Sequence, residues 1–390
     1  MRRLVPAICS ILLLSLAACG GGGGSTATGA GSMSAAAELG AKLFNDSALS
    51  STGAMSCASC HDAGNHHAAP DTRSVPAGAD AGHEAGRQAP SLQYLRFNGR
   101  FAFASDGTPT GGFTWDGRAA TLAAQAEGPL LNPNEMANAS VEDVVAKLRR
   151  STNAAEFQKV FGSDIFDRPA DAFARLRFAL QQYQLEDPDF APFSSKFDHW
   201  LAGKAQLTAS ELKGLALFND PNKGNCAACH TSTGANGNPP LFTDNTFDAL
   251  GVPRNPEIQA NADAGYYDLG LCGPSRTDLA GRTDLCGAFR VPTLRNVART
   301  APYFHNGAIK TLTDAVRFYV RRDTNPEEWY PTDSNGVVRK FNDLPPAYRA
   351  NVNVTEAPYN RKPGDAPALS ESEIADVVAF LNTLTDGYTP

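Results

Sequence analysis

The segment Cys-x-x-Cys-His occurs twice in this chain and constrains its fold more than any other feature. The two copies are Cys57-Ala58-Ser59-Cys60-His61 and Cys226-Ala227-Ala228-Cys229-His230. Two thiols at this spacing add to the two vinyl groups of a porphyrin, while the adjacent imidazole reaches the iron. The sequence therefore predicts two covalently attached haem c groups.

Two other interpretations of the motif are weaker. A redox disulfide would use Cys-x-x-Cys but would not require a histidine at the next position in both copies. A zinc site needs four ligands, and the two motifs are far apart with no second Cys-x-x-Cys or His-x-x-x-His nearby. Covalent haem remains the favoured interpretation.

The motifs belong to an internal repeat. Leu43-Phe44-Asn45-Asp46 precedes the first motif, and Leu217-Phe218-Asn219-Asp220 precedes the second. Such self-similarity is typical of duplicated structural units. We expect two units in which a helix leads into a haem-binding loop.

Helical periodicity and capping residues predict most of the remaining order. Capping boxes are expected at Thr208 with Glu211 and at Ser370 with Glu373. The predicted helices cover residues 35–44, 141–149, 170–183, 211–218, 312–321 and 371–384, with a further helix that ends near Trp200. A boundary near Gly203 would divide the chain into domains 35–203 and 204–390.

The first residues predict export. Residues 1–18 combine two arginines, a short apolar run and small residues, which is typical of a signal peptide. Leu16-Ala17-Ala18-Cys19 resembles a lipobox, so Cys19 is the expected lipid attachment site and residues 19–34 a flexible tether. The resemblance implies a periplasmic protein anchored to the outer membrane. Ordinary cleavage near the same place is the alternative.

Composition narrows the partners and the compartment. The chain has 34 Lys and Arg against 41 Asp and Glu, spread evenly, so nucleic acid is not an expected partner. No later apolar run reaches membrane-spanning length, which leaves the N-terminal lipid as the expected membrane contact. An oxidising compartment allows disulfides, and Cys272 and Cys286 are predicted to form one; a catalytic cysteine is the alternative.

Several ordered motifs carry a family resemblance. They are Ala89-Pro90-Ser91-Leu92, Trp115-Asp116-Gly117-Arg118-Ala119, Asn132-Pro133-Asn134-Glu135-Met136, Val291-Pro292-Thr293-Leu294-Arg295-Asn296 and Ala301-Pro302-Tyr303-Phe304-His305-Asn306-Gly307. Together they resemble the bacterial diheme cytochrome c peroxidase and MauG superfamily over nearly the whole mature chain. The resemblance implies an all-α fold of two cytochrome c-like haem domains with long irregular loops.

The resemblance also implies roles for individual residues. The first haem would react with hydrogen peroxide, with Glu135 moving the proton and Gln125 as a hydrogen-bonding partner in the distal pocket. Trp115 matches the tryptophan that lies between the two haems and carries an electron hole. A calcium ion is expected between the domains, at Gln88, Thr300 and Pro302, although Gln88 replaces the family's asparagine.

The second axial ligand of the second haem distinguishes the branches of the superfamily. Conventional members use methionine, but the last methionine here is Met136, and Tyr319 aligns with the ligand position. MauG-like members have tyrosine there, a hard anionic donor that stabilises high-valent iron. None of His66, His67 and His83 has the spacing of the histidine that ligates the first haem in conventional members, although His83 remains an alternative to a vacant site.

These features together predict a peroxidase-like oxidoreductase. Hydrogen peroxide would produce a high-valent diheme state that oxidises a tryptophan or tyrosine of a partner protein. The amino-acid sequence of the loops after Arg322 most resembles that of MbnH-like enzymes, which are paired with a small copper-binding protein. Peroxide detoxification with electrons from a periplasmic donor is the alternative enzyme, and a non-enzymatic diheme electron carrier is the alternative outside enzymes.

Overall fold

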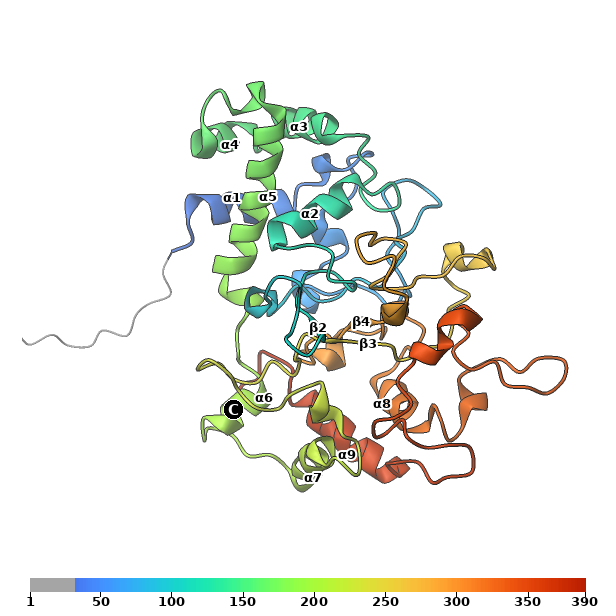
Figure 1. Ribbon diagram of the computed structural model, residues 1–390. Helices are drawn as coiled ribbons and strands as arrows, with labels where there is room; N and C mark the ends of the chain where they lie inside the picture. The colour runs from blue at the N-terminus through green and yellow to red at the C-terminus, as the bar shows by residue number, and fades with distance from the viewer. Residues whose placement is uncertain (1–31) are drawn as a thin grey trace, which may run out of the picture. The chain divides into compact units, whose positions relative to one another are not determined.

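The computed structural model describes residues 32–390, in which Met33–Pro390 form one compact unit. The predicted signal peptide, Cys19 and most of the predicted tether lie outside the described residues. Within this range the α-helices are α1 (Ala35–Phe44), α2 (Leu122–Leu131), α3 (Val141–Arg150), α4 (Ala154–Phe161), α5 (Pro169–Glu186), α6 (Lys196–Leu201), α7 (Ala209–Asn219), α8 (Leu312–Arg321) and α9 (Glu371–Asn382). Figure 1 shows these helices joined by long irregular loops.

Strands are few and short in the described part of the chain. Strand β1 (Ala102–Phe103) pairs antiparallel with β2 (Pro109–Thr110), and β3 (Phe247–Asp248) pairs antiparallel with β4 (Phe289–Arg290). The prediction of a mainly helical protein is thus confirmed. None of the helices in residues 32–390 combines the length and apolar character that crossing a membrane requires.

The predicted caps lie where the sequence places them. The side chain of Ser140 accepts a hydrogen bond from the Asp143 amide, and Thr311 accepts one from the Asp314 amide. Complete capping boxes open α7 at Thr208 and α9 at Ser370. Each cap satisfies an amide that the first helical turn leaves without a partner, which is why these helix starts are predictable.

Two helices were not expected. Helix α2 includes Gly128 and Pro129, residues that usually end helices, and α4 begins at Asn153 without a side-chain cap. Pro129 lies late in α2, and the chain leaves the helix at Asn132 two residues after Leu130, whose side chain is buried in the core. Tertiary burial therefore stabilises α2 against its own composition.

The internal repeat extends to helix packing. Helix α1 crosses α5, and α7 crosses α9 in the same way (Figure 1). At each crossing a glycine allows close approach of the two backbones: a Cβ at Gly40 would lie 2.0 Å from the Ala179 carbonyl, and one at Gly214 would lie 2.0 Å from the Asp376 carbonyl. Each half of the chain therefore uses a glycine contact to bring the helix before its Cys-x-x-Cys-His segment against a later helix.

A second repeated element follows the helix crossings. Phe113 and Ala119 form an isolated antiparallel bridge just before the Thr121 cap of α2. Tyr303 and Ile309 form the same bridge just before the Thr311 cap of α8. Trp115 and His305 occupy the equivalent positions inside these two turns, which places a different side chain at the same point of each unit.

Two large hydrophobic clusters fill the interior. One is built from buried residues between Leu39 and Phe190, and the other from buried residues between Phe197 and Leu384. Leu43 and Leu217, which precede the two Cys-x-x-Cys-His segments, belong to different clusters. The domain boundary near Gly203 stays a prediction.

Candidate haem and peroxide sites

The first Cys-x-x-Cys-His segment forms a short 3-10 turn at Cys57–Ser59. The Nδ1 atom of His61 lies 3.2 Å from the His67 carbonyl oxygen, and burial lowers the pKa of His61 to about 4. A neutral imidazole whose Nδ1 is engaged by a carbonyl presents Nε2 as a ligand. This is the arrangement that binds iron.

The second segment repeats the arrangement. Its turn covers Cys226–Ala228, and the Nδ1 atom of His230 lies 2.9 Å from the Phe242 carbonyl oxygen. Burial also raises the pKa of the Cys226 thiol to about 12. The second segment thus repeats a buried Cys-x-x-Cys-His arrangement, which suits covalent attachment to haem.

A large cavity adjoins the second segment and fits a haem. Cys226, Cys229 and His230 line it, together with mainly apolar side chains. Tyr319, from the last half of α8, lines the same cavity, and its ring centroid lies 5.8 Å from Phe304 and 6.1 Å from Tyr359. Burial raises the pKa of the Tyr319 hydroxyl, so a phenolate at this position would need a cation in the cavity, such as a haem iron held by His230 would provide.

A buried guanidinium provides a second test of fit. Arg290 lines the cavity and is 7% exposed, yet within residues 32–390 it forms no ion pair. Its Nε and Nη1 atoms donate only to the Thr114 carbonyl and to the Asn245 side chain, and burial lowers its pKa to about 10. Burying an unpaired charge is costly, so the position of Arg290 suits an anion in the cavity, such as a haem propionate.

Glu135 lies beside the first haem segment. It sits in the loop after α2, where its carboxylate accepts a hydrogen bond of 3.0 Å from Asn132 Nδ2. Burial raises the pKa of Glu135, and the charge of Glu135 in turn is the second cause, after burial, that raises the pKa of Cys60 to about 11. A partly desolvated carboxylate near the haem attachment point is suited to exchanging protons with a bound oxygen species.

Gln125 is half-buried on α2. Within the described residues no hydrogen bond joins Gln125 to Glu135; the Glu135 carboxylate accepts instead from Asn132, three residues earlier. Asn132 was part of a recognised motif but was not singled out. The helical start of α2 at Thr121 places Gln125 one turn along, on the same helix that leads to the Glu135 loop.

Trp115 lies at the edge of the cavity next to the second haem segment. Its Nε1 atom donates to the Gln88 carbonyl at 2.8 Å, and its own carbonyl accepts from the Arg290 amide at 2.8 Å. The indole is therefore fixed through its ring and through its backbone. It touches residues that come from both halves of the chain.

The histidines of the first loop differ in their surroundings. His83 is exposed, and its Nδ1 atom lies 3.2 Å from the Pro133 carbonyl, in the loop that carries Glu135. His67 is buried and its ring stacks on Phe190 at 4.1 Å. His66 and His67 both have positive φ, near 57° and 52°, a backbone conformation that aims the His67 carbonyl at His61.

The residues expected to bind calcium line the same cavity as Trp115. The Gln88 side-chain amide lies 3.5 Å from the Thr300 carbonyl, and Pro302 also lines the cavity. The Gln88 backbone amide donates to the His305 carbonyl at 2.8 Å. Gln88 is therefore tied to Trp115, to Thr300 and to His305 at once.

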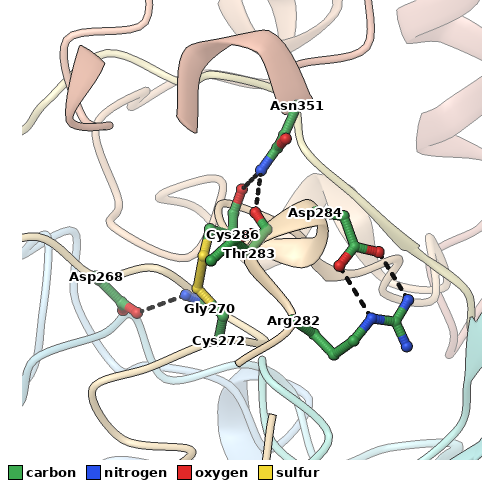
Figure 2. Close-up of a disulfide and its surroundings, with 8 residues drawn as sticks. All are labelled: Asp268, Gly270, Cys272, Arg282, Thr283, Asp284, Cys286 and Asn351. Atoms are coloured by element: carbon green, nitrogen blue, oxygen red, sulfur yellow. Dashed lines mark hydrogen bonds and ion pairs between the residues drawn. A yellow bond between two sulfur atoms is a disulfide. The ribbon is translucent and has the colours of Figure 1, made fainter. Parts of the chain in front are cut away.

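A disulfide joins Cys272 to Cys286 (Figure 2). Both cysteines are buried, and Asn351 donates through Nδ2 to the carbonyls of Thr283 and Cys286. The disulfide closes a loop next to β4, the strand that carries Arg290. The loop thus belongs to the surroundings of the cavity.

Comparisons with known proteins agree with this geometry. A family model described as di-haem cytochrome c peroxidase matches residues 34–206. The methylamine utilization protein MauG of Paracoccus denitrificans is 33% identical over 368 residues, which cover 90% of this chain and 89% of that protein.

Two solved structures are similar over nearly the whole chain. The diheme peroxidase BthA from Burkholderia thailandensis E264 has a TM-score of 0.84 and 43% identity, covering 90% of this chain and 86% of its own. A MauG-like protein associated with microbial copper homeostasis has a TM-score of 0.62 and 27% identity, covering 91% of each chain.

Proposed function

We propose a protein substrate for this chain, which belongs to the superfamily of diheme cytochrome c peroxidases and MauG proteins and is therefore a peroxide-using diheme oxidoreductase with two haem c groups. The proposed reaction removes two electrons from aromatic side chains of a partner protein. Hydrogen peroxide takes up these two electrons and two protons and becomes two water molecules. The observation that carries the proposal is the position of Tyr319.

Tyr319 lines the cavity of the second haem segment, and the residues lining that cavity include no methionine. A thioether ligand would raise the potential of the haem and favour storage of an electron from a small donor. A phenolate oxygen is a hard anionic ligand that stabilises the oxidised metal. With Tyr319 as the ligand, the second haem would be suited to holding oxidising equivalents for a large external substrate.

Glu135 is the proposed proton-transfer residue at the first haem. Its carboxylate is held by Asn132 at 3.0 Å, and its raised pKa suits a group that accepts a proton from peroxide and returns it to the leaving oxygen. Arg118 and Arg87 are near enough for their charges to lower the pKa of Glu135 and limit the effect of burial. Gln125, from α2, is proposed to orient the same oxygen.

Trp115 is proposed to pass oxidising equivalents between the two haems. The bonds from Trp115 Nε1 to Gln88 and from the Arg290 amide to the Trp115 carbonyl hold it between the first-half and second-half loops. Calcium is proposed to bind at Gln88, Thr300 and Pro302; the Gln88 carbonyl accepts the Trp115 Nε1 hydrogen bond. The protein is proposed to act in the periplasm, anchored by a lipid on Cys19.

The proposed partner is a small copper-binding protein. The support is the structural similarity to a MauG-like protein associated with microbial copper homeostasis, and a resemblance in the loops after Arg322. Mass spectrometry of the candidate partner tests this directly. A mass change on one of its aromatic residues that requires both hydrogen peroxide and the active protein is the expected result.

The first experiment is an optical and electron paramagnetic resonance titration of the fully oxidised protein with hydrogen peroxide, without added reductant. The expected result is a rapid spectral change at both haems. A reaction that begins only after one haem is reduced would indicate a conventional peroxidase fed by a periplasmic donor. Two six-coordinate haems that never react would indicate an electron carrier.

A further inference from the structure

The residues next to Trp115 are bound to a segment that is distant in sequence and closed by the Cys272–Cys286 disulfide. We call residues 268–290 the disulfide segment. Figure 2 shows the Gly270 amide donating to the Asp268 carboxylate, at 3.1 Å, next to the disulfide. The Leu271 amide bonds the Ala288 carbonyl, so the two arms of the segment are also joined through their backbones. Asp268 therefore projects from a firmly held backbone.

Arg87 connects Asp268 to the residue that follows Trp115. Its Nε and Nη2 atoms bind the two oxygens of Asp268 at 2.6 and 2.8 Å, and its Nη1 atom binds Asp116 at 2.7 Å. The Asp116 side chain is 0% exposed. A guanidinium offers a rigid fork that fits one carboxylate in bidentate fashion while a third N–H remains for another acceptor. Arg87 binds Asp268 with the two N–H groups of its fork and Asp116 with a third.

The disulfide segment reaches the same place by two further routes. Arg276 donates through Nη1 to the Asp116 carbonyl at 2.8 Å, and its guanidinium lies 3.8 Å from the Phe101 ring centroid. The Arg290 amide donates to the Trp115 carbonyl at 2.8 Å. Arg276 and Arg290 thus contact two consecutive residues directly, and Asp268 reaches the second of them through Arg87.

We infer that Asp268 is a positioning residue for Trp115, acting through Arg87 and Asp116; this rests on the proposed role of Trp115 between the haems. Asp268 anchors the Arg87 fork, and the fork holds the Asp116 carboxylate together with Arg118 and Thr114. The backbone of Asp116 in turn continues directly from that of Trp115. Electron transfer through an aromatic ring depends on its distance and orientation, so a small displacement of the ring slows the transfer. Asp268 also balances the charge of Arg87, which would otherwise disfavour a positive charge on the indole.

The test compares Asp268→Asn with a matched control, Asp284→Asn. Asp284→Asn removes the same charge from the same segment. In the described residues the Asp284 side chain is exposed and pairs only with Arg282 (Figure 2). Two properties are measured without hydrogen peroxide: the ultraviolet resonance Raman bands of tryptophan, which report the indole torsion and its Nε1 hydrogen bond, and the rate of electron exchange between the haems after one is reduced. Asp268→Asn is expected to shift the bands and to slow the exchange about tenfold. Asp284→Asn is expected to leave both unchanged, and Asp268→Glu to restore part of the rate.

Arg87→Lys provides an independent test of the inference if Asp268→Asn fails to fold. Lysine keeps the positive charge but cannot bind both carboxylates with a planar fork. The same Raman shift and slower exchange are expected. An unchanged indole band in both folded variants, or an equal change in Asp284→Asn, would overturn the inference. Because peroxide is absent from these measurements, failure of the proposed function would show separately, as a wild-type protein that does not react with hydrogen peroxide.

Discussion

The indole Nε1 atom of Trp115 donates a hydrogen bond to the backbone carbonyl of Gln88, at 2.8 Å. The Gln88 amide in turn donates to the His305 carbonyl, and the Arg290 amide donates to the Trp115 carbonyl, each at 2.8 Å. Gln88 and Arg290 are equivalent positions, each just before a Pro-containing motif of its own unit. The two units therefore exchange a matched pair of backbone hydrogen bonds at the position of Trp115.

Calcium removal should act on Trp115 through Gln88. We expect one calcium ion per chain by atomic absorption, and we expect chelation to slow electron exchange between the haems because Gln88 would lose the ion that fixes its side chain. Gln88→Ala should lower the calcium content and show the same slow exchange without chelator. A chain that contains no calcium and is indifferent to chelators would contradict the predicted site.

Glu135→Gln should slow the reaction with hydrogen peroxide by about 10²- to 10⁴-fold, because the amide keeps the shape but cannot accept the proton. Stopped-flow absorbance at the haem bands measures the rate. Glu327→Gln is the matched control, since Glu327 is exposed and lies in the loop after α8. Equal rates for Glu135→Gln and wild type would remove Glu135 from the mechanism.

The pH dependence of that reaction should follow Glu135. Burial raises its pKa above the ordinary 4.5, and only the deprotonated form accepts a proton. The rate constant should therefore fall as pH decreases through the raised pKa, at a higher pH than an exposed glutamate would produce. Rate measurements across pH, repeated in Glu135→Gln, check this; the inflection should be missing from the variant.

Tyr319→Met should make the second haem resemble that of a conventional peroxidase. The thioether replaces an anionic oxygen, so the midpoint potential of that haem should rise by on the order of 100 mV. Spectroelectrochemistry measures the shift, and the reaction with peroxide should then require prior reduction. Tyr359→Phe, which alters the neighbouring ring without removing the proposed ligand, is the comparison; an equal shift there would argue against ligation by Tyr319.

Gly214→Ala should destabilise the second unit by about 1–3 kcal/mol. Alanine favours a helix over glycine by under about 1 kcal/mol, but the added Cβ would lie 2.0 Å from the Asp376 carbonyl, so the clash dominates. Chemical denaturation of the holoprotein measures the change. Gly281→Ala, where a Cβ meets nothing within 4 Å, should be close to neutral.

The helices were predictable where local chemistry decides them. Thr208 and Ser370 cap helices within four residues of themselves, so the sequence alone indicates where α7 and α9 begin. Helix α2 was not predicted, because Gly128 and Pro129 argue against a helix; its Thr121 cap and the burial of Leu122 and Leu130 stabilise it nonetheless. The haem-attachment residues could be proposed from the sequence because covalent attachment fixes their spacing.

The contacts around the predicted site residues were harder to predict from the sequence. Asn132 could have been found, because it lies three residues before Glu135 in the same motif. The unpaired charge of Arg290 and the bridge from Arg87 to Asp268 involve residues far apart in sequence, and no periodicity marks such pairs. The roles of Glu135, Gln125, Trp115 and Tyr319 remain predictions that the experiments above address.

The repeated turns around Trp115 and His305 have an evolutionary consequence. The bridges, the caps and the exchanged backbone bonds are shared by both copies, so the backbone does not depend on which aromatic ring stands at the centre of each turn. One copy could therefore acquire an indole suited to redox chemistry while its twin kept an imidazole stacked on Phe289. Divergence at this single pair of positions changes the side chain at the centre of each turn and leaves the paired backbone around it the same.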